Sequence, residues 1–160
     1  MTDFGALLGR LARADVEFVV VGGLAVLTHG HVRATLDLDV CYARTPENLQ
    51  RLERALVPIH PRLRGAPPDL PFFFDEQTLR NGLNFTLVTD EGDLDLLGEV
   101  TGIGGYGDMA LAAITVEAFG VSFKLMALDD LIRAKAAAGR AKDLLDLEAL
   151  RALARAKRGH

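Results

Sequence analysis

The sequence predicts an α+β domain whose mixed β-sheet is flanked by helices and followed by C-terminal helices. Strand-like runs at 16–21 and 35–42 are separated by a short helical segment, and two hairpin-like strand pairs follow them. The last part, about 127–158, is helical throughout. Because no internal repeat and no long linker interrupts this order, we expect a single domain over residues 1–160.

The first elements are defined by apolar spacing and by glycine. Apolar residues from Phe4 to Leu11 repeat at helical spacing, which predicts a helix over about 3–14. The run "VEFVVVGG" predicts a buried strand that stops at a glycine pair, and "GLAVLTHG" predicts a short helix that begins there. In "TPENLQRLERAL", Thr45 is a suitable cap and Pro46 suits the first helical position, so a helix follows the second strand.

The second half begins with an irregular connection. Five prolines between positions 58 and 71 predict an exposed loop. "NFTLVTDEGDLDLLG" then predicts two strands joined at Gly92, and "ITVEAFGVSFKLM" a further pair about Gly120. The helices "LDDLIRAKAAAG" and "AKDLLDLEALRALARA" end the chain, separated near Gly139 and Arg140.

Composition excludes several classes of protein. No apolar run approaches the ~20 residues that span a bilayer, and the first residues lack the pattern of a signal peptide, so we expect a cytoplasmic protein with no membrane partner. The single cysteine, Cys41, excludes an internal disulfide and is expected to be a small buried hydrophobe.

Charge is unevenly distributed along the chain. The net charge of −4 argues against generic binding of duplex DNA. Residues 133–158, however, carry eight basic side chains against three acidic ones, a net of +5 that leaves −9 for the remainder. This segment favours an RNA acceptor such as tRNA, although a solvated helical face explains the charge equally well.

Acidic residues replace apolar ones on one face of the strand in "TLDLDV". Leu36, Leu38 and Val40 share one side of the predicted strand, and Asp37 and Asp39 share the other. Neighbouring carboxylates repel one another, so a positive partner is required between them, either an arginine or lysine side chain or a metal ion. The repeated pattern in "DLDLL" favours the metal ion.

These features together predict a nucleotide-triphosphate site. Gly22 and Gly23 allow a phosphate to approach the backbone at the start of a helix. Asp37 and Asp39 offer oxygen ligands for Mg²⁺, and Asp95 from the later strand is a third carboxylate for a two-metal arrangement.

The segment "GGLAVLTHGHVRATLDLDV" resembles the opening motif of the DNA polymerase beta-like nucleotidyltransferase superfamily: a glycine pair, a short helix, then hydrophobic-Asp-hydrophobic-Asp. "LDL" at 94–96 resembles its third-carboxylate motif. "LDDLIRAKAAAGRAKDLLDLEAL" is similar to the basic and acidic pattern of its small AbiEii-like and minimal members, some of which are toxins of toxin–antitoxin pairs.

The resemblance implies a nucleotidyltransferase fold and a transferase that moves a nucleoside monophosphate from a nucleoside triphosphate, such as ATP, to a hydroxyl of RNA, a protein or a small molecule. Two Mg²⁺ ions, with Mn²⁺ as a substitute, would be held by three catalytic carboxylates, and a cognate antitoxin would be a partner. The implied metal and catalytic residues are Asp37, Asp39 and Asp95, and Lys135 is implied as catalytic and phosphate-binding; the implied nucleotide-binding residues are Gly22, Gly23, Arg33, Lys135, Arg140 and Asp143.

Several side chains have two interpretations. Asp93 faces the same way as Asp95, but we prefer Asp95 because leucine flanks it on both sides. Arg33 is either a site residue or a loop arginine that pairs with Asp37. His29 and His31 are expected to be loop residues because they lack a full metal-ligand set.

Asp146 lies one helical turn from Asp143, and both are also explained by helix solvation, with Arg140 or Lys142 as partners. Two alternative functions remain for the whole chain. One is a catalytically inactive nucleotidyltransferase-fold interaction module. The other, remote, is a dinucleotide-binding protein built on Gly102, Gly104 and Gly107, which match Gly-x-Gly-x-x-Gly but precede a segment too short for the required helix.

Overall fold

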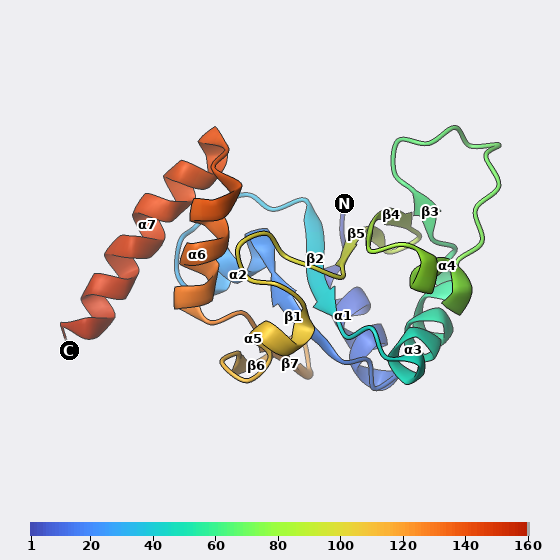
Figure 1. Cartoon of the computed structure of the whole chain (residues 1–160), viewed down its shortest axis with the longest axis horizontal. Coiled ribbons are helices and arrows are strands. Elements are labelled where there is room, and N and C mark those ends of the chain that lie inside the picture. Colours follow the sequence, from blue (N-terminus) through green and yellow to red (C-terminus); the bar gives the residue numbers. More distant parts are fainter. Residues whose placement is uncertain (160) are drawn as a thin grey trace.

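A seven-stranded sheet runs through the protein in the order β3-β4-β5-β2-β1-β7-β6, in a computed structural model that describes residues 1–159 (Figure 1). The strands are β1 (Phe18–Val21), β2 (Asp37–Tyr42), β3 (Arg62–Leu63), β4 (Asn84–Thr89), β5 (Gly92–Leu97), β6 (Ile114–Ala118) and β7 (Val121–Leu125). The pairs β1–β7 and β2–β5 are parallel and the other four are antiparallel, so the predicted mixed sheet is confirmed.

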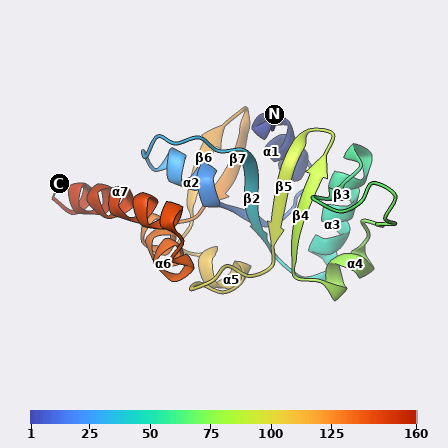
Figure 2. The same ribbon diagram turned by 90° about the horizontal axis from the view of Figure 1, so that it is seen from above.

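Seven α-helices and one 3₁₀ turn flank this sheet within the described residues. They are α1 (Phe4–Arg13), α2 (Gly22–Thr28), α3 (Pro46–Leu56), the turn η1 (Val57–Ile59), α4 (Glu76–Asn81), α5 (Tyr106–Met109), α6 (Leu128–Ala138) and α7 (Ala141–Arg158). Helices α6 and α7 lie at one end of the molecule, and α3 and α4 lie at the other (Figures 1 and 2). None of the helices in residues 1–159 has both the length and the apolar character that crossing a membrane requires.

Local signals explain the predicted helices. The side chain of Asp3 accepts a hydrogen bond from the backbone N–H of Ala6 and begins α1, and Thr45 caps α3 with Pro46 at its first position. Gly139 has φ of +67°, and this left-handed residue separates α6 from α7, as the sequence predicts.

The core lies on the face of β2 opposite its aspartates. Leu38 and Val40 have no exposed surface, and they belong to the same buried cluster as Leu7 and Leu11 of α1 and Leu52 of α3. Helix α1 packs against β7 and α3, while α2 packs against β1, β2 and α6. The alternation of β2 therefore directs its leucine and valine into the core and its aspartates to the other face.

Three details differ from the sequence prediction. The second strand begins at Asp37 rather than at position 35, because its pairing with β5 begins there, and Leu36 is consequently exposed. The proline-rich connection contains the two-residue strand β3, which pairs with β4. Helix α4 was not predicted, although Asp75 caps it through a 2.8 Å hydrogen bond from Thr78 N–H.

Candidate active site

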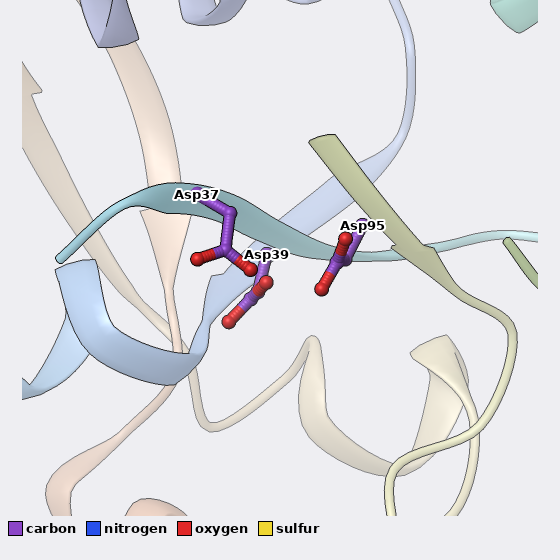
Figure 3. Close-up of side chains that lie close together, drawn as sticks. All are labelled: Asp37, Asp39 and Asp95. Atoms are coloured by element: carbon purple, nitrogen blue, oxygen red, sulfur yellow. The ribbon is translucent and has the colours of Figure 1, made fainter. Parts of the chain in front are cut away.

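Three aspartates from two parallel strands converge on one side of the sheet. Asp37 and Asp39 come from β2 and Asp95 from β5, and one carboxylate oxygen of each lies within 4.8 Å of the others. Figure 3 shows the three side chains leaving their strands toward the same region. In the parallel register Asp39 stands opposite Asp95, and Asp37 opposite Asp93, so strand pairing alone creates the cluster.

Burial and mutual repulsion dominate the electrostatics of this triad. Burial raises the pKa of Asp39 to about 8, and the charges of Asp95 and Asp37 add to this effect. The pKa of Asp37 is also raised, first by burial and then by the charge of Asp95 and a hydrogen bond with it. The Oδ1 atom of Asp39 is buried and has no hydrogen-bond partner among residues 1–159. A buried, unbonded carboxylate oxygen beside two other carboxylates suits a hard divalent cation.

An arginine that the sequence analysis missed also reaches the triad. Arg64, just after β3, donates from Nη2 to Asp95 Oδ1 at 2.8 Å, and its Nη1 lies 3.8 Å from Asp37 Oδ2. The expected positive partner is thus partly this side chain, but no arginine contacts Asp39 within the described residues. Only the pairing of β3 with β4 brings Arg64 here, so no local sequence pattern could reveal it.

Asp93 lies outside the triad that contains Asp95. Its Oδ2 lies 3.5 Å from Arg64 Nε, and it does not belong to the converging triad. It lies opposite Asp37, two residues before Asp95 on β5.

The glycine pair borders the triad directly. Gly22 begins α2 with φ of +66°, and a Cβ atom there would lie 2.0 Å from Oδ2 of Asp39. A Cβ atom on Gly23 would lie 2.6 Å from Thr35 Oγ1. The backbone at Gly22 therefore leaves room for the carboxylate of Asp39, and any other residue there would be strained as well as crowded.

A cleft of about 560 Å³ opens over these groups. Gly22, Gly23 and the triad line it, together with a basic group of four side chains, Arg33, Lys135, Arg140 and Lys142. Asn84, Leu97, Glu99 and Thr101 also line it. The structure thus brings every residue of the predicted site to a single cleft.

Two side chains of the basic group, Lys135 and Arg140, form ion pairs with buried acidic residues. Lys135 is only 8% exposed, and its Nζ lies 3.0 Å from Asp143 Oδ1 and 3.3 Å from Asp146 Oδ2. Arg140 Nε donates to Asp143 Oδ2 at 2.5 Å. Burial alone would raise the pKa of Asp143, but the hydrogen bonds from Arg140 and Lys135 overcome it and lower that pKa to about 2.

Arg33 pairs with a residue far along the chain. Its Nη1 forms an ion pair with Asp146, and His31 Nε2 lies 3.5 Å from the same carboxylate. The alternative pairing of Arg33 with Asp37 is therefore wrong, and helix solvation does not describe Asp146, which is 4% exposed. His29 Nε2 forms a 2.8 Å hydrogen bond with Met126 O, so neither histidine belongs to a metal cluster found in residues 1–159.

The remaining candidates take structural positions. Cys41 is buried, and burial raises the pKa of its thiol to about 12, as expected for an inert residue. Helix α5, which begins at Tyr106 and contains Gly107, comprises only four residues. The dinucleotide-binding motif needs a full helix at this point, so the structure speaks against that alternative.

No protein-family model matches the sequence, and no curated protein matches it. Among solved structures, the chain is similar to the crystal structure of the lincosamide antibiotic adenylyltransferase LnuA with lincomycin bound. The two share 16% sequence identity with a TM-score of 0.56, over 95% of this chain and 98% of that one. The likeness extends over nearly the whole chain, and the fold of this chain is accordingly the nucleotidyltransferase fold.

Proposed function

We propose that the protein is a divalent-metal-dependent nucleotidyltransferase that moves a nucleoside monophosphate from a nucleoside triphosphate, such as ATP, to a hydroxyl acceptor and releases pyrophosphate. The observation that carries this proposal is the convergence of Asp37, Asp39 and Asp95 beside Gly22. Within residues 1–159, one buried oxygen of Asp39 in this cluster accepts no hydrogen bond. The nucleotidyltransferase fold supports it.

Asp37, Asp39 and Asp95 would hold one or two Mg²⁺ ions, with Mn²⁺ as a substitute. When bound, the metal ions stabilise the charge that develops on the phosphates and lower the pKa of the attacking hydroxyl. The chain supplies the rigid geometry: β2 and β5 are adjacent strands in register, which fixes the carboxylates without a flexible loop.

The triphosphate would lie in the cleft, between the start of α2 and the basic group. Gly22 and Gly23 present no side chains there, and Lys135 and Arg140 line the same cleft. Because Asp143 and Asp146 fix the position of the Lys135 ammonium, the lysine is oriented before the nucleotide arrives. The acceptor would then bind next to Asn84, Glu99 and Thr101, which also line the cleft.

The acceptor candidates are RNA such as tRNA, a protein and a small hydroxyl compound. The structural neighbour LnuA is a lincosamide antibiotic adenylyltransferase, which makes lincomycin a suitable test compound. A toxin role with a cognate antitoxin is a narrower form of the same proposal and rests on the resemblance of the C-terminal segment.

A second candidate is a non-catalytic interaction module with the same fold. The observation that favours it is the contact of Arg64 with Asp95, which satisfies part of the carboxylate cluster without a metal ion. Metal-dependent nucleotide binding distinguishes the transferase from the interaction module, because the module requires no divalent ion.

A labelling experiment tests the proposal. Purified protein is incubated with α-labelled nucleoside triphosphates and Mg²⁺, in the presence of total RNA, a protein extract or lincomycin. We expect label transfer to one acceptor, lost with EDTA and in Asp37→Ala, and retained in Asp69→Ala, which alters an exposed residue outside the cleft. Equal labelling by the two variants, or no metal-dependent nucleotide binding by the native chain, would contradict it.

A further inference from the structure

Arg64 makes a two-sided contact with the carboxylate cluster. Its Nη2 donates to Asp95 Oδ1 and to the carbonyl oxygen of Leu87, both at 2.8 Å. The same guanidinium lies 3.8 Å from Asp37 Oδ2 and 3.5 Å from Asp93 Oδ2. One side chain therefore bridges aspartates of two different strands.

Arg64 is the basic residue in direct contact with this carboxylate group. Within residues 1–159, no other arginine or lysine lies within 4.0 Å of a carboxylate oxygen of Asp37, Asp39, Asp93 or Asp95. Lys135 already forms ion pairs with Asp143 and Asp146. The guanidinium thus offsets part of the repulsion among four carboxylates, and it leaves Asp39 unpaired.

The contact of Arg64 is incomplete. Its Nε is buried and forms no hydrogen bond in the described part of the chain, since its distance of 3.5 Å to Asp93 is an ion-pair contact only. A buried N–H without an acceptor costs free energy, so the present position of the guanidinium is less favourable than a fully bonded one. Arg64 is also 30% exposed in its side chain, which gives it solvent to move into.

We propose that Arg64 is an internal counter-ion that competes with a divalent cation for the carboxylates of Asp37 and Asp95. This inference rests on the proposed function, because the cation is the one that function requires. A divalent ion between the three carboxylates adds two positive charges next to the guanidinium, so the bond from Arg64 to Asp95 and the binding of metal oppose each other. The opposition is reciprocal: whatever holds Arg64 in place weakens metal binding, and metal binding weakens its hold.

The competition couples the metal site to the connection between η1 and α4. Arg64 follows directly on β3, and its backbone N–H donates to Thr86 O at 2.9 Å, so the edge strand presents the side chain to the cluster. The long segment after it, 65–75, has no regular structure of its own. Metal binding would therefore change the structure first at this edge of the sheet, at β3 and the segment after it.

Titration with Mn²⁺ alone, followed by electron paramagnetic resonance, tests the inference on Arg64→Met. We expect this variant to bind Mn²⁺ about tenfold more tightly than the native chain, because a unit charge is removed a few ångströms from a doubly charged ion. In EDTA its melting temperature should be lower than that of the native chain, and Mn²⁺ should narrow the difference. Arg62→Met is the matched control: Arg62 is exposed on β3, two residues before Arg64, and forms no ion pair within residues 1–159, so both quantities should stay at native values.

Two further variants separate the possible outcomes. Arg64→Lys keeps the positive charge and introduces no apolar side chain, so its Mn²⁺ affinity should stay within about twofold of the native value. A tenfold gain in Mn²⁺ affinity in this variant would contradict competition by charge. Asp39→Asn should bind Mn²⁺ weakly. If Asp39→Asn loses Mn²⁺ while Arg64→Met binds it no more tightly than the native chain, the inference is wrong and the metal site stands. If native chain, Arg64→Met and Asp39→Asn all fail to bind Mn²⁺, both proposals are overturned.

Discussion

Asp39 and Asp95 stand opposite each other in the parallel pairing of β2 with β5, and both project from the same face of the sheet. Because the two parallel strands pair in register, their carboxylates stay close together independently of the conformation of the loops. This closeness is costly without a cation, and it has measurable consequences for stability.

Stability should depend on pH through Asp39. Its pKa is about 8 in the folded chain and near 3.9 in the unfolded chain, so between these values the folded form retains a proton that the unfolded form has lost. The free energy of unfolding should therefore fall by a few kcal/mol from about pH 4 to about pH 8 and level off above. Urea titrations in EDTA over this range measure the slope, which should be smaller in Asp39→Asn. Superimposable profiles of the two proteins would show that Asp39 ionises normally.

Gly22→Ala should damage the site and the fold together. A Cβ atom 2.0 Å from Asp39 Oδ2, on a backbone with φ of +66°, must displace the carboxylate. We expect a loss of about 1–3 kcal/mol in the free energy of unfolding and weaker Mn²⁺ binding. Gly107→Ala is the control, since a Cβ atom there meets nothing within 4 Å. A Gly22→Ala protein with native stability would mean that this turn is not constrained.

Asp143→Asn should destabilise the chain through the buried ion pairs. Asp143 is fully buried between Lys135 and Arg140, and its lowered pKa contributes stability that is present above about pH 4 and lost as pH falls toward 2. We expect a loss of roughly 3 kcal/mol at pH 7 by urea unfolding. Glu148→Gln, at an exposed position of the same helix, should change stability by less than about 0.5 kcal/mol.

If RNA is the acceptor, the exposed basic residues of α7 should bind its phosphates. Neutralising Arg151, Arg155 and Lys157 together should weaken RNA binding and flatten its dependence on salt, by about 0.7 in the logarithmic slope for each lost phosphate contact. A filter-binding series over salt concentration measures this. An unchanged slope would remove RNA binding by this helix, and the charge-matched control alters exposed arginines outside α7, namely Arg13, Arg54 and Arg62.

The part of the site that could be predicted depends on short-range patterns. The alternation in "TLDLDV" and "DLDLL" placed Asp37, Asp39 and Asp95 on strands, and the glycine pair marked the turn into α2. Both are properties of a few consecutive residues: a period of two and a positive φ. The mixed sheet followed from the order of elements, because each run was long enough to identify.

The part that could not be predicted arises from contacts between distant residues. Arg64 reaches Asp95 only because β3, two residues long, pairs with β4, and so short a strand leaves no periodic signal. Arg33 and Asp146 are 113 positions apart, and their pairing depends on how α7 packs on α6 beside the loop after α2. The sequence offers nearer partners for Asp146, namely Arg140 and Lys142, and contains no local signal for Arg33.

Anomalous diffraction from crystals grown with Mn²⁺ and a non-hydrolysable ATP analogue tests the metal site most directly. The account predicts a Mn²⁺ peak between β2 and β5, about 2.0–2.4 Å from oxygens of Asp37, Asp39 and Asp95, with Arg64 farther from Asp95 than 2.8 Å. A structure with the analogue bound, no Mn²⁺ at the three aspartates and Arg64 still hydrogen-bonded to Asp95 would contradict it.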